Sequence, residues 1–275
     1  MSNKIEILEN TLLKLLVRRG GDLDRQNITL DEGELGYTTD NKRLFVGDDI
    51  ILNKSGSSET GSTVHIGGGK GVSSLNIGYN SLTSNTSGSN NTAVGDEALK
   101  ANTTGIKNTA IGKNSLYSNT YGQQNVGIGF ESLKNNSSGS YNTAVGVEAN
   151  RSNTSGVLNT SVGYEALETN SSGSANTALG SRALRYNSSG SNNTAVGAYS
   201  LDANTTGTQN TATGVHSLGS NTTGSYNTAH GSYSLYRNTT GTKNTAMGYY
   251  SLGNNTTGSN NTAQGYNALN ANTTG

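Results

Sequence analysis

Glycine recurs at every seventeenth position in two series that run without a slip through the C-terminal three quarters of the chain. Together they frame one short unit, approximately N-T-A-x-G-x-x-A-L-x-x-N-T-T-G-x-x, present in twelve consecutive copies. A fixed period without insertions is typical of a solenoid, in which each copy packs only on its neighbours. The repeat therefore predicts a rod-shaped protein. Such a rod holds other structures apart or presents a surface, and it seldom catalyses a reaction. The first series runs from Gly78 to Gly265 and the second from Gly88 to Gly275.

Composition excludes several other classes of protein. Hydrophobic residues make up 30% of the chain and charged residues 13%, with a formal net charge of zero. A disordered chain would carry high net charge, and a nucleic-acid or anionic-membrane partner would call for a basic surface. Proline is absent, which fits continuous strand pairing, and cysteine is absent, which excludes disulfides and thiolate metal sites. We expect no nucleic-acid partner and no membrane insertion.

Residues 1–20 have the pattern of an amphipathic helix. Ile5, Leu8, Leu12 and Leu15 follow the 3-4-3 spacing of a coiled-coil seam, and basic residues and glycines follow at 18–21, as at a helix end. Two heptads are too short to be stable alone. The seam is expected either to associate with other copies or a partner, or to cover a small globular core.

Residues 21–55 have the pattern of a small β module. The stretches 27–30, 34–38 and 43–47 are predicted to be short strands, and the last two form a hairpin closed around Asp40 and Asn41. A small core of four residues is expected there, and residues 56–71 are a Gly/Ser-rich transition to the repeats of 72–275. Residues 1–71 also carry 20 of the 36 charged side chains. The expected core consists of Leu35, Tyr37, Leu44 and Phe45.

Within each repeat, T-A-V-G is predicted to form a short strand whose alanine and following Val or Ile face opposite sides. A leucine four residues after the strand glycine is the expected inward anchor, replaced once by Asn150. Each buried leucine contributes roughly 1.5–3 kcal/mol. Two asparagine columns, one beginning at Asn85 and one at Asn91, are expected to form ladders between copies. The core leucines are Leu99, Leu116, Leu133, Leu167, Leu184, Leu201, Leu218, Leu235, Leu252 and Leu269.

The predicted fold is therefore all-β, a repetitive parallel β-roll or β-solenoid shaft preceded by a short helix and a small β-hairpin module. One thin coil of this kind buries little surface, so we expect three chains to associate as a homotrimer. Handedness, and whether the chains lie side by side or interwind, stay open.

Two segments resemble known families. The unit N-T-A-V-G-D-E-A-L-K-A-N-T-T-G (91–105) is similar to head repeats of trimeric autotransporter adhesins and, more closely, to arrays in phage tail-fibre proteins. The adhesin heads are trimeric left-handed parallel β-rolls with a shorter coil. The segment L-D-E-G-E-L-G-Y-T-T-D-N-K-R-L-F-V-G-D-D (30–49) resembles the N-terminal module of phage fibre and tropism proteins. That resemblance implies that residues 1–55 anchor the chain to other virion proteins.

The sequence favours a virion fibre made in a bacterial cytoplasm. The N-terminal residues lack the apolar core of a secretory signal, and no membrane-anchor barrel is recognised, features that a secreted adhesin would need. Three alternatives stay open. They are a bacterial surface adhesin with glycan-binding repeats, a head or collar decoration fibre, and an ice-binding solenoid suggested by threonine columns. Thr103, Ser137, Ser171 and Thr205 interchange in one such column, which argues against ice binding.

No catalytic, metal or cofactor site is expected in the repeats. Their carboxylates are interpreted as lying at unmatched phases, and His216 and His230 are out of phase with each other, so neither an acid–base pair nor a shared metal is predicted. Tyr164, Tyr249 and Tyr266 occupy one phase just after the strand glycine. They are candidate contacts for a host cell-surface glycan, weighed against a role in shielding the coil edge, which we favour.

Overall fold

The computed structural model describes residues 18–20, 35–38, 44–46 and 74–275. The chain divides into two units, Met1–Val64 and His65–Gly275, each described by itself. The predicted helical seam, the expected strand at 27–30 and the 56–71 transition lie outside the described residues.

The N-terminal unit contains three short strands in the order β1-β2-β3. Strand β2 (Leu35–Thr38) pairs antiparallel with β3 (Leu44–Val46), so the predicted hairpin is confirmed. Strand β1 (Arg18–Gly20) pairs in parallel with β2. The expectation that the helix reaches residue 20 is therefore wrong, because these backbone groups bond to a strand distant in sequence. The expected side-chain core of the hairpin stays a prediction.

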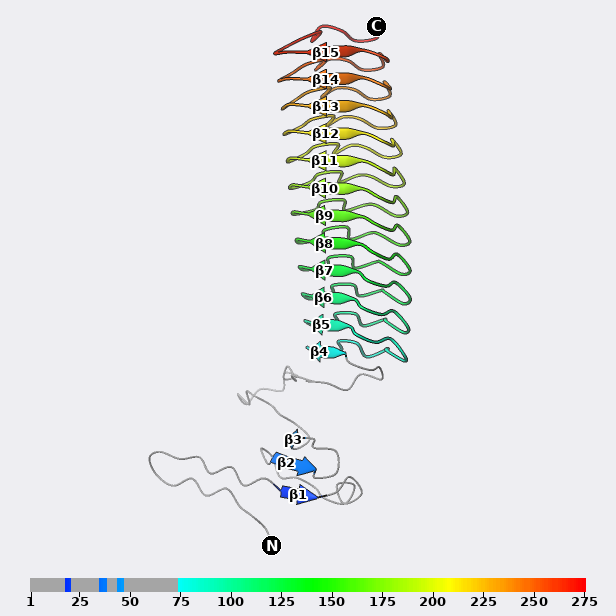
Figure 1. Cartoon of the computed structure of the whole chain (residues 1–275), viewed down its shortest axis with the longest axis vertical. Coiled ribbons are helices and arrows are strands. Elements are labelled where there is room, and N and C mark those ends of the chain that lie inside the picture. The colour runs from blue at the N-terminus through cyan, green and yellow to red at the C-terminus, as the bar shows by residue number, and fades with distance from the viewer. Residues whose placement is uncertain (1–17, 21–34, 39–43, 47–73) are drawn as a thin grey trace, which may run out of the picture. The chain divides into compact units, whose positions relative to one another are not determined.

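The C-terminal unit is a β-solenoid with one three-residue strand per coil (Figure 1). Twelve strands form a single parallel sheet in sequence order, and every strand pairs with the equivalent positions of the next repeat. The predicted all-β solenoid is confirmed. The strands are β4 (Leu75–Ile77), β5 (Thr92–Val94), β6 (Thr109–Ile111), β7 (Val126–Ile128), β8 (Thr143–Val145), β9 (Thr160–Val162), β10 (Thr177–Leu179), β11 (Thr194–Val196), β12 (Thr211–Thr213), β13 (Thr228–His230), β14 (Thr245–Met247) and β15 (Thr262–Gln264).

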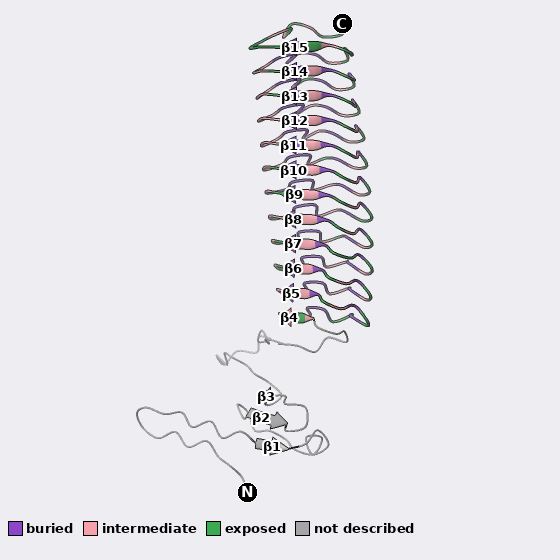
Figure 2. Cartoon of the chain, viewed as in Figure 1, coloured by how far each residue is buried: buried purple, intermediate pink, exposed green. Residues whose placement is uncertain are grey.

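Burial alternates along each strand and repeats from coil to coil (Figure 2). The central alanine, such as Ala178, is fully buried, whereas the third residue, such as Leu179, is exposed. This confirms the predicted opposite facing of the two positions. Ser161 and Gly127 replace the alanine in the coils of β9 and β7, and β4, at the N-terminal edge of the sheet, is the exception with a half-buried Asn76.

The leucine column forms the apolar core, as predicted, and a single chain suffices to bury it. Leu99 to Leu252 have no solvent exposure, so the leucines need no second chain to cover them. Leu269 is the exception. It lies in the last described coil and is 53% exposed there, so in this structure it is not part of the buried core to which it was assigned. Asn150 interrupts the column, and the buried apolar residues fall into two clusters on either side of it.

Both asparagine columns form the predicted ladders, and both are buried. In the first, the Asn170 amide donates to the Asn153 carbonyl at 3.0 Å and to the backbone oxygen of Gly173 at 2.9 Å. In the second, the Asn176 amide donates to the Gly190 oxygen at 2.8 Å, and its backbone N–H donates to the Asn159 side chain. These polar groups can be buried because each finds a partner in its own coil or the next.

Three non-glycine residues in each complete coil have a left-handed backbone. Examples are Glu165, Leu167 and Ala175, with φ of 53°, 57° and 56°. Left-handed geometry costs an L-residue roughly 1–2 kcal/mol. It persists because backbone bonds between coils fix it: Leu167 N–H donates to the Ala183 oxygen, and Ala175 N–H to that of Val157, both at 2.9 Å.

The two glycine series have steric causes. Gly163 has φ of +134°, and a Cβ there would lie 2.6 Å from the carbonyl oxygen of Gly180 in the next coil. At Gly173 a Cβ would collide with the Gly190 oxygen and with the side chain of Asn170. Neighbouring coils approach too closely at both positions for any side chain.

We expect Ala175→Gly to stabilise the solenoid by about 0.5–1 kcal/mol. Relief of left-handed strain, roughly 1–2 kcal/mol, exceeds the entropic cost of glycine, roughly 0.5–1 kcal/mol. The control is Ala203→Gly, where φ is not positive and the change should be destabilising. Thermal or denaturant unfolding of both variants measures the difference. Equal effects of one sign would contradict the argument from strain.

We expect Asn150→Leu to stabilise the shaft. The Asn150 side chain is fully buried, and its Nδ2 and Oδ1 have no hydrogen-bond partner, which costs on the order of 1–3 kcal/mol. Leucine occupies the same left-handed geometry at Leu133 and Leu167. The reciprocal control, Leu184→Asn, should lower stability. A melting temperature that Asn150→Leu leaves unchanged or reduces would show that the amide is satisfied in solution.

Candidate functional site on the variable edge of the solenoid

Two columns of residues that vary from coil to coil run along one edge of the solenoid. They are the second and fifth residues after the strand glycine, for example Glu165 and Glu168 after Gly163. We call these two columns the variable edge. Each column repeats once per coil, so equivalent side chains from successive coils lie next to each other. From the coil of β5 to that of β10 this edge is mainly charged, and from β11 to β14 it is mainly aromatic.

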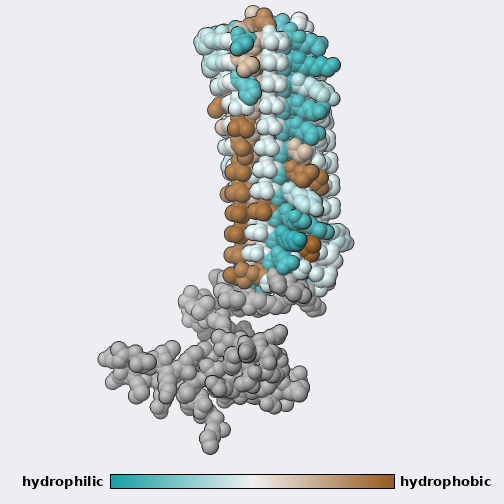
Figure 3. Space-filling view, viewed as in Figure 1, coloured by the Kyte–Doolittle hydropathy of each residue, from teal (hydrophilic) through white to brown (hydrophobic). Residues whose placement is uncertain are grey.

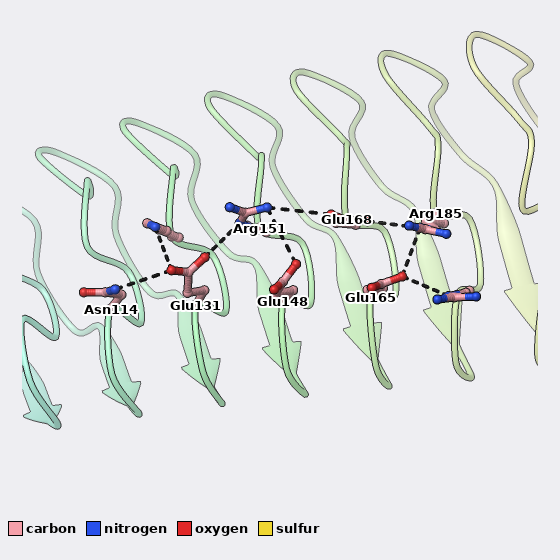
Figure 4. Close-up of polar contacts among 9 residues, drawn as sticks. Asn114, Glu131, Glu148, Arg151, Glu165, Glu168 and Arg185 are labelled. Carbon is pink, nitrogen blue, oxygen red and sulfur yellow. Dashed lines mark hydrogen bonds and ion pairs between the residues drawn. The ribbon is translucent and has the colours of Figure 1, made fainter.

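The charged part is a network of ion pairs that crosses several coils (Figure 4). Arg185 Nε lies 3.1 Å from both Glu165 and Glu168, and Arg182 Nε lies 2.9 Å from Glu165. Arg151 reaches Glu131 at 3.0 Å, although its N–H is not aligned as a hydrogen bond, and it lies 3.8 Å from Glu168. The network therefore links the coils of β7 to β10 outside the backbone ladder.

These contacts correct the expectation that the repeat carboxylates lie at unmatched phases. Glu97, Glu131, Glu148 and Glu165 all stand two residues after a strand glycine. The signal was present in the sequence, but it appears only when residues are aligned by coil and a separation of one repeat is interpreted as spatial contact. The carboxylates bind arginine or lysine, and their role in this network is structural.

The ion pairs around Glu165 determine the direction in which the pKa of its carboxyl group is shifted. Burial alone would raise the pKa of this carboxyl, but hydrogen bonds from Tyr164 and Arg182, and the charges of Arg185 and Arg182, outweigh burial. The pKa of Glu165 is therefore lowered from its ordinary value. Since the folded pKa is lowered, the stability that this group contributes is present above the ordinary carboxyl pKa of about 4.3 and is lost as pH falls through the folded value.

Asp202 behaves in the opposite way. Burial raises its pKa, and the charges of Arg185, Arg182 and His216 only partly oppose this effect. Its Oδ1 atom is buried without a hydrogen-bond partner. Because the folded pKa is raised, the charged form destabilises the fold at neutral pH, and stability is regained as pH falls through the folded value.

Toward the C-terminal end, the variable edge becomes a ladder of stacked rings. The rings of Tyr199 and His216 stack with centroids 4.9 Å apart, His216 and Tyr233 at 5.1 Å, and Tyr233 and Tyr250 at 5.7 Å. Tyr236 meets His216 and Tyr233 edge-on. We call these five rings the aromatic ladder. Stacking of this kind stabilises a structure by about 0.5–1.5 kcal/mol per pair beyond burial.

Glycines beside the aromatic ladder make room for its rings. A Cβ at Gly219 would lie 3.2 Å from the Tyr236 ring, and one at Gly253 would collide with the Tyr250 ring. In other coils this fifth position carries larger residues such as Lys134 or Arg185. The ring column and the glycines are thus complementary, a relationship that was not predicted from the sequence.

The three candidate glycan contacts lie in different surroundings. All are exposed: 47% for Tyr164, 46% for Tyr249 and 75% for Tyr266. The Tyr164 ring lies against the Arg182 guanidinium, 5.7 Å from its centroid, and so belongs to the charged network. Tyr249 and Tyr266 stack on each other at 5.5 Å, beside the aromatic ladder. The structure brings only the last two together, and glycan contact stays a prediction for all three.

The hydroxyl groups of the threonine column considered for ice binding form hydrogen bonds within the solenoid. Hydroxyls of Thr103, Ser137, Ser171 and Thr205 each donate to a backbone oxygen in the next coil, at 2.9–3.0 Å. Within the described residues, no cluster of three His, Cys, Asp or Glu side chains is suited to a metal ion. Over the same part of the chain, no helix has the length and apolar character needed to cross a bilayer.

Comparison with known families gives one match. Residues 17–48 match the family described as the major tropism determinant N-terminal domain, and this range contains β1, β2 and β3. No curated protein and no solved structure matches the chain. The matched segment agrees with the resemblance noted at 30–49. Together with the repetitive β-solenoid, it supports a phage fibre-like or tropism-related protein and is consistent with a virion component.

We expect two substitutions on the variable edge to have opposite effects that both depend on pH. Glu165→Gln should lower the melting temperature at pH 7, and the loss should shrink toward pH 3, where the native carboxyl becomes protonated. Asp202→Asn should raise the melting temperature at pH 7, and this gain should disappear toward pH 3. Thermal unfolding at several pH values measures both. Effects of the same sign at pH 7 would refute the assigned electrostatics.

Proposed function

We propose that this protein is a structural fibre of a bacteriophage virion. Residues 1–55 join it to other virion proteins, and the repeats form a shaft that serves host attachment. The observation that carries the proposal is the match of residues 17–48 to a tropism-determinant N-terminal domain in the same chain as a twelve-strand solenoid. An attachment segment next to a long repetitive body is the organisation that a fibre requires.

The shaft has the physical properties of a rigid spacer. Consecutive coils are joined on every side of the ring: by the β-sheet, by backbone bonds through the turns and by two buried asparagine ladders. Bending would stretch several of these bonds together. At about 4.8 Å per coil, twelve strands give a stacked length on the order of 50 Å.

The proposed assembly is a homotrimer, and the proposed receptor contact is a host cell-surface glycan. The exposed, stacked pair Tyr249 and Tyr266 supports a contact in the C-terminal coils better than the single ring of Tyr164, which packs against Arg182. A head or collar position for the fibre, and a bacterial surface adhesin, remain the alternatives. An ice-binding role has no support, because the hydroxyls of the threonine column are hydrogen-bonded to backbone oxygens.

The test is incorporation of two deletion variants into phage particles. Deletion of 17–48 should leave a folded solenoid, verified by circular dichroism, that is absent from purified particles. The matched control removes 142–175, two whole repeats, and joins Tyr141 to Asn176 in register. This variant should be incorporated at normal copy number with a shaft about 10 Å shorter.

Gold labelling of wild-type particles in electron micrographs separates tail from head or collar attachment. Normal incorporation of the 17–48 deletion would refute the proposed anchor. Presence of the protein on the bacterial surface, and its absence from particles, would instead support the adhesin alternative.

A further inference from the structure

One face of the solenoid carries an uninterrupted line of apolar side chains that are exposed or half-buried. It consists of the third residues of β4 to β11, and we call it the apolar row. Successive members are direct partners in the parallel sheet, as with Val145 and Val162 or Val162 and Leu179. Several are 36–39% exposed despite their apolar character. The members are Ile77, Val94, Ile111, Ile128, Val145, Val162, Leu179 and Val196.

The apolar row ends within the solenoid, although the strands continue. In β12 to β15 the same position holds Thr213, His230, Met247 and Gln264. Figure 3 shows the change: brown side chains form a line along the shaft from its N-terminal end and give way to paler and teal ones near the C-terminal end. The backbone geometry of the strands is the same on both sides of this boundary. The fold therefore does not require apolar residues here, and another constraint accounts for them.

Neighbouring residues widen the apolar row near its middle. Phe130, Val147 and Tyr164 stand two residues after Ile128, Val145 and Val162, and are 42–47% exposed. No charged residue occurs in the row itself, while the variable edge of the same coils is rich in charge. A continuous exposed apolar surface of this kind marks an interaction site.

We propose that the apolar row is the surface by which parallel copies of this chain pack against one another, in the coils of β4 to β11. This inference rests on the proposed homotrimer and identifies its contact face. The spacing between successive side chains of the row determines which partner can match it. A surface that matches one apolar side chain per coil must itself rise by about 4.8 Å per step. A second copy of the solenoid has this rise by construction.

In a trimer of this chain, parallel packing in register uses the whole row of every copy. Eight apolar positions of one copy then face the same eight of another, over about 34 Å. An antiparallel pair could also match the row, but three equivalent copies around one axis along the shaft must run in the same direction. A stable interface usually buries about 800 Å² per partner. Because each member of the row and its flanking residues is less than half exposed, an interface of that size needs the full length of the row.

The coils of β12 to β15 lie outside the proposed interface. Their third strand positions are polar or long, and their variable edge carries most of the aromatic ladder. Packing through the apolar row leaves the surfaces of these C-terminal coils accessible. The proposed structure thus divides the shaft into an assembly segment and a presentation segment.

The first test compares two double substitutions by light scattering. The wild-type chain should have three times its mass of 28.3 kDa. Val145→Lys with Val162→Lys should reduce the mass to that of one chain, because like charges from the copies would meet in an apolar contact. Thr213→Lys with Met247→Lys, at the equivalent position beyond the row, should leave the mass unchanged. Circular dichroism should show folded solenoids in both variants.

The second test covers the case in which residues outside the row hold the copies together. The chain has no cysteine, so a single introduced thiol is unique. Val145→Cys should be cross-linked between copies by a short bis-thiol reagent, because packed sheet faces lie about 10 Å apart, beyond the roughly 7 Å that a direct disulfide tolerates. Ser172→Cys, exposed in a turn, should not. A trimeric wild type in which Val145→Cys cross-links no better than Ser172→Cys overturns the contact face but leaves the fibre proposal standing. A monomeric wild type overturns both the face and the homotrimer.

Discussion

The solenoid depends on the two buried asparagine ladders. Each short coil has few apolar side chains and encloses mainly leucine, alanine and asparagine, and the asparagines could not be buried without partners. Each amide bonds a glycine carbonyl, within its own turn for the Asn170 column and in the turn of the next coil for the Asn176 column. Each also bonds the asparagine of the adjacent coil. The same hydrogen bonds therefore hold each coil in shape and set the register between neighbouring coils.

This arrangement explains why the repeat tolerates no insertion. A slip of one residue between two coils would remove both asparagines from their partners and place glycine carbonyls against Cβ atoms. At Gly163 and Gly173 no space exists for such an atom. The variable edge has no such constraint, because its side chains point away from the ring, and there the sequence changes from charged to aromatic along the shaft.

The period, the leucine core, the asparagine ladders and the β2–β3 hairpin could be predicted from the sequence, because each depends on residue types that recur at fixed spacing. The left-handed backbone at Glu165, Leu167 and Ala175 could not, because these residues do not favour it and only contacts between coils impose it. Strand β1 was missed for a similar reason, since its pairing with β2 is distant in sequence. The charged network and the aromatic ladder could have been found by aligning the coils, which places Glu165 beside Arg182.

In a shaft built from a single file of coils, tension along the axis passes through every junction between neighbours. Within one chain no parallel route relieves a weak junction, so the weakest one sets the load that this chain can bear. Asn150 creates such a junction, since two unpartnered polar atoms replace a leucine and the apolar core divides there. The ion pairs of Arg151 with Glu131 and Glu168 span the same coil from outside. We therefore expect tension to separate each chain first at the coil of Asn150, where the ion pairs of Arg151 bear part of the load.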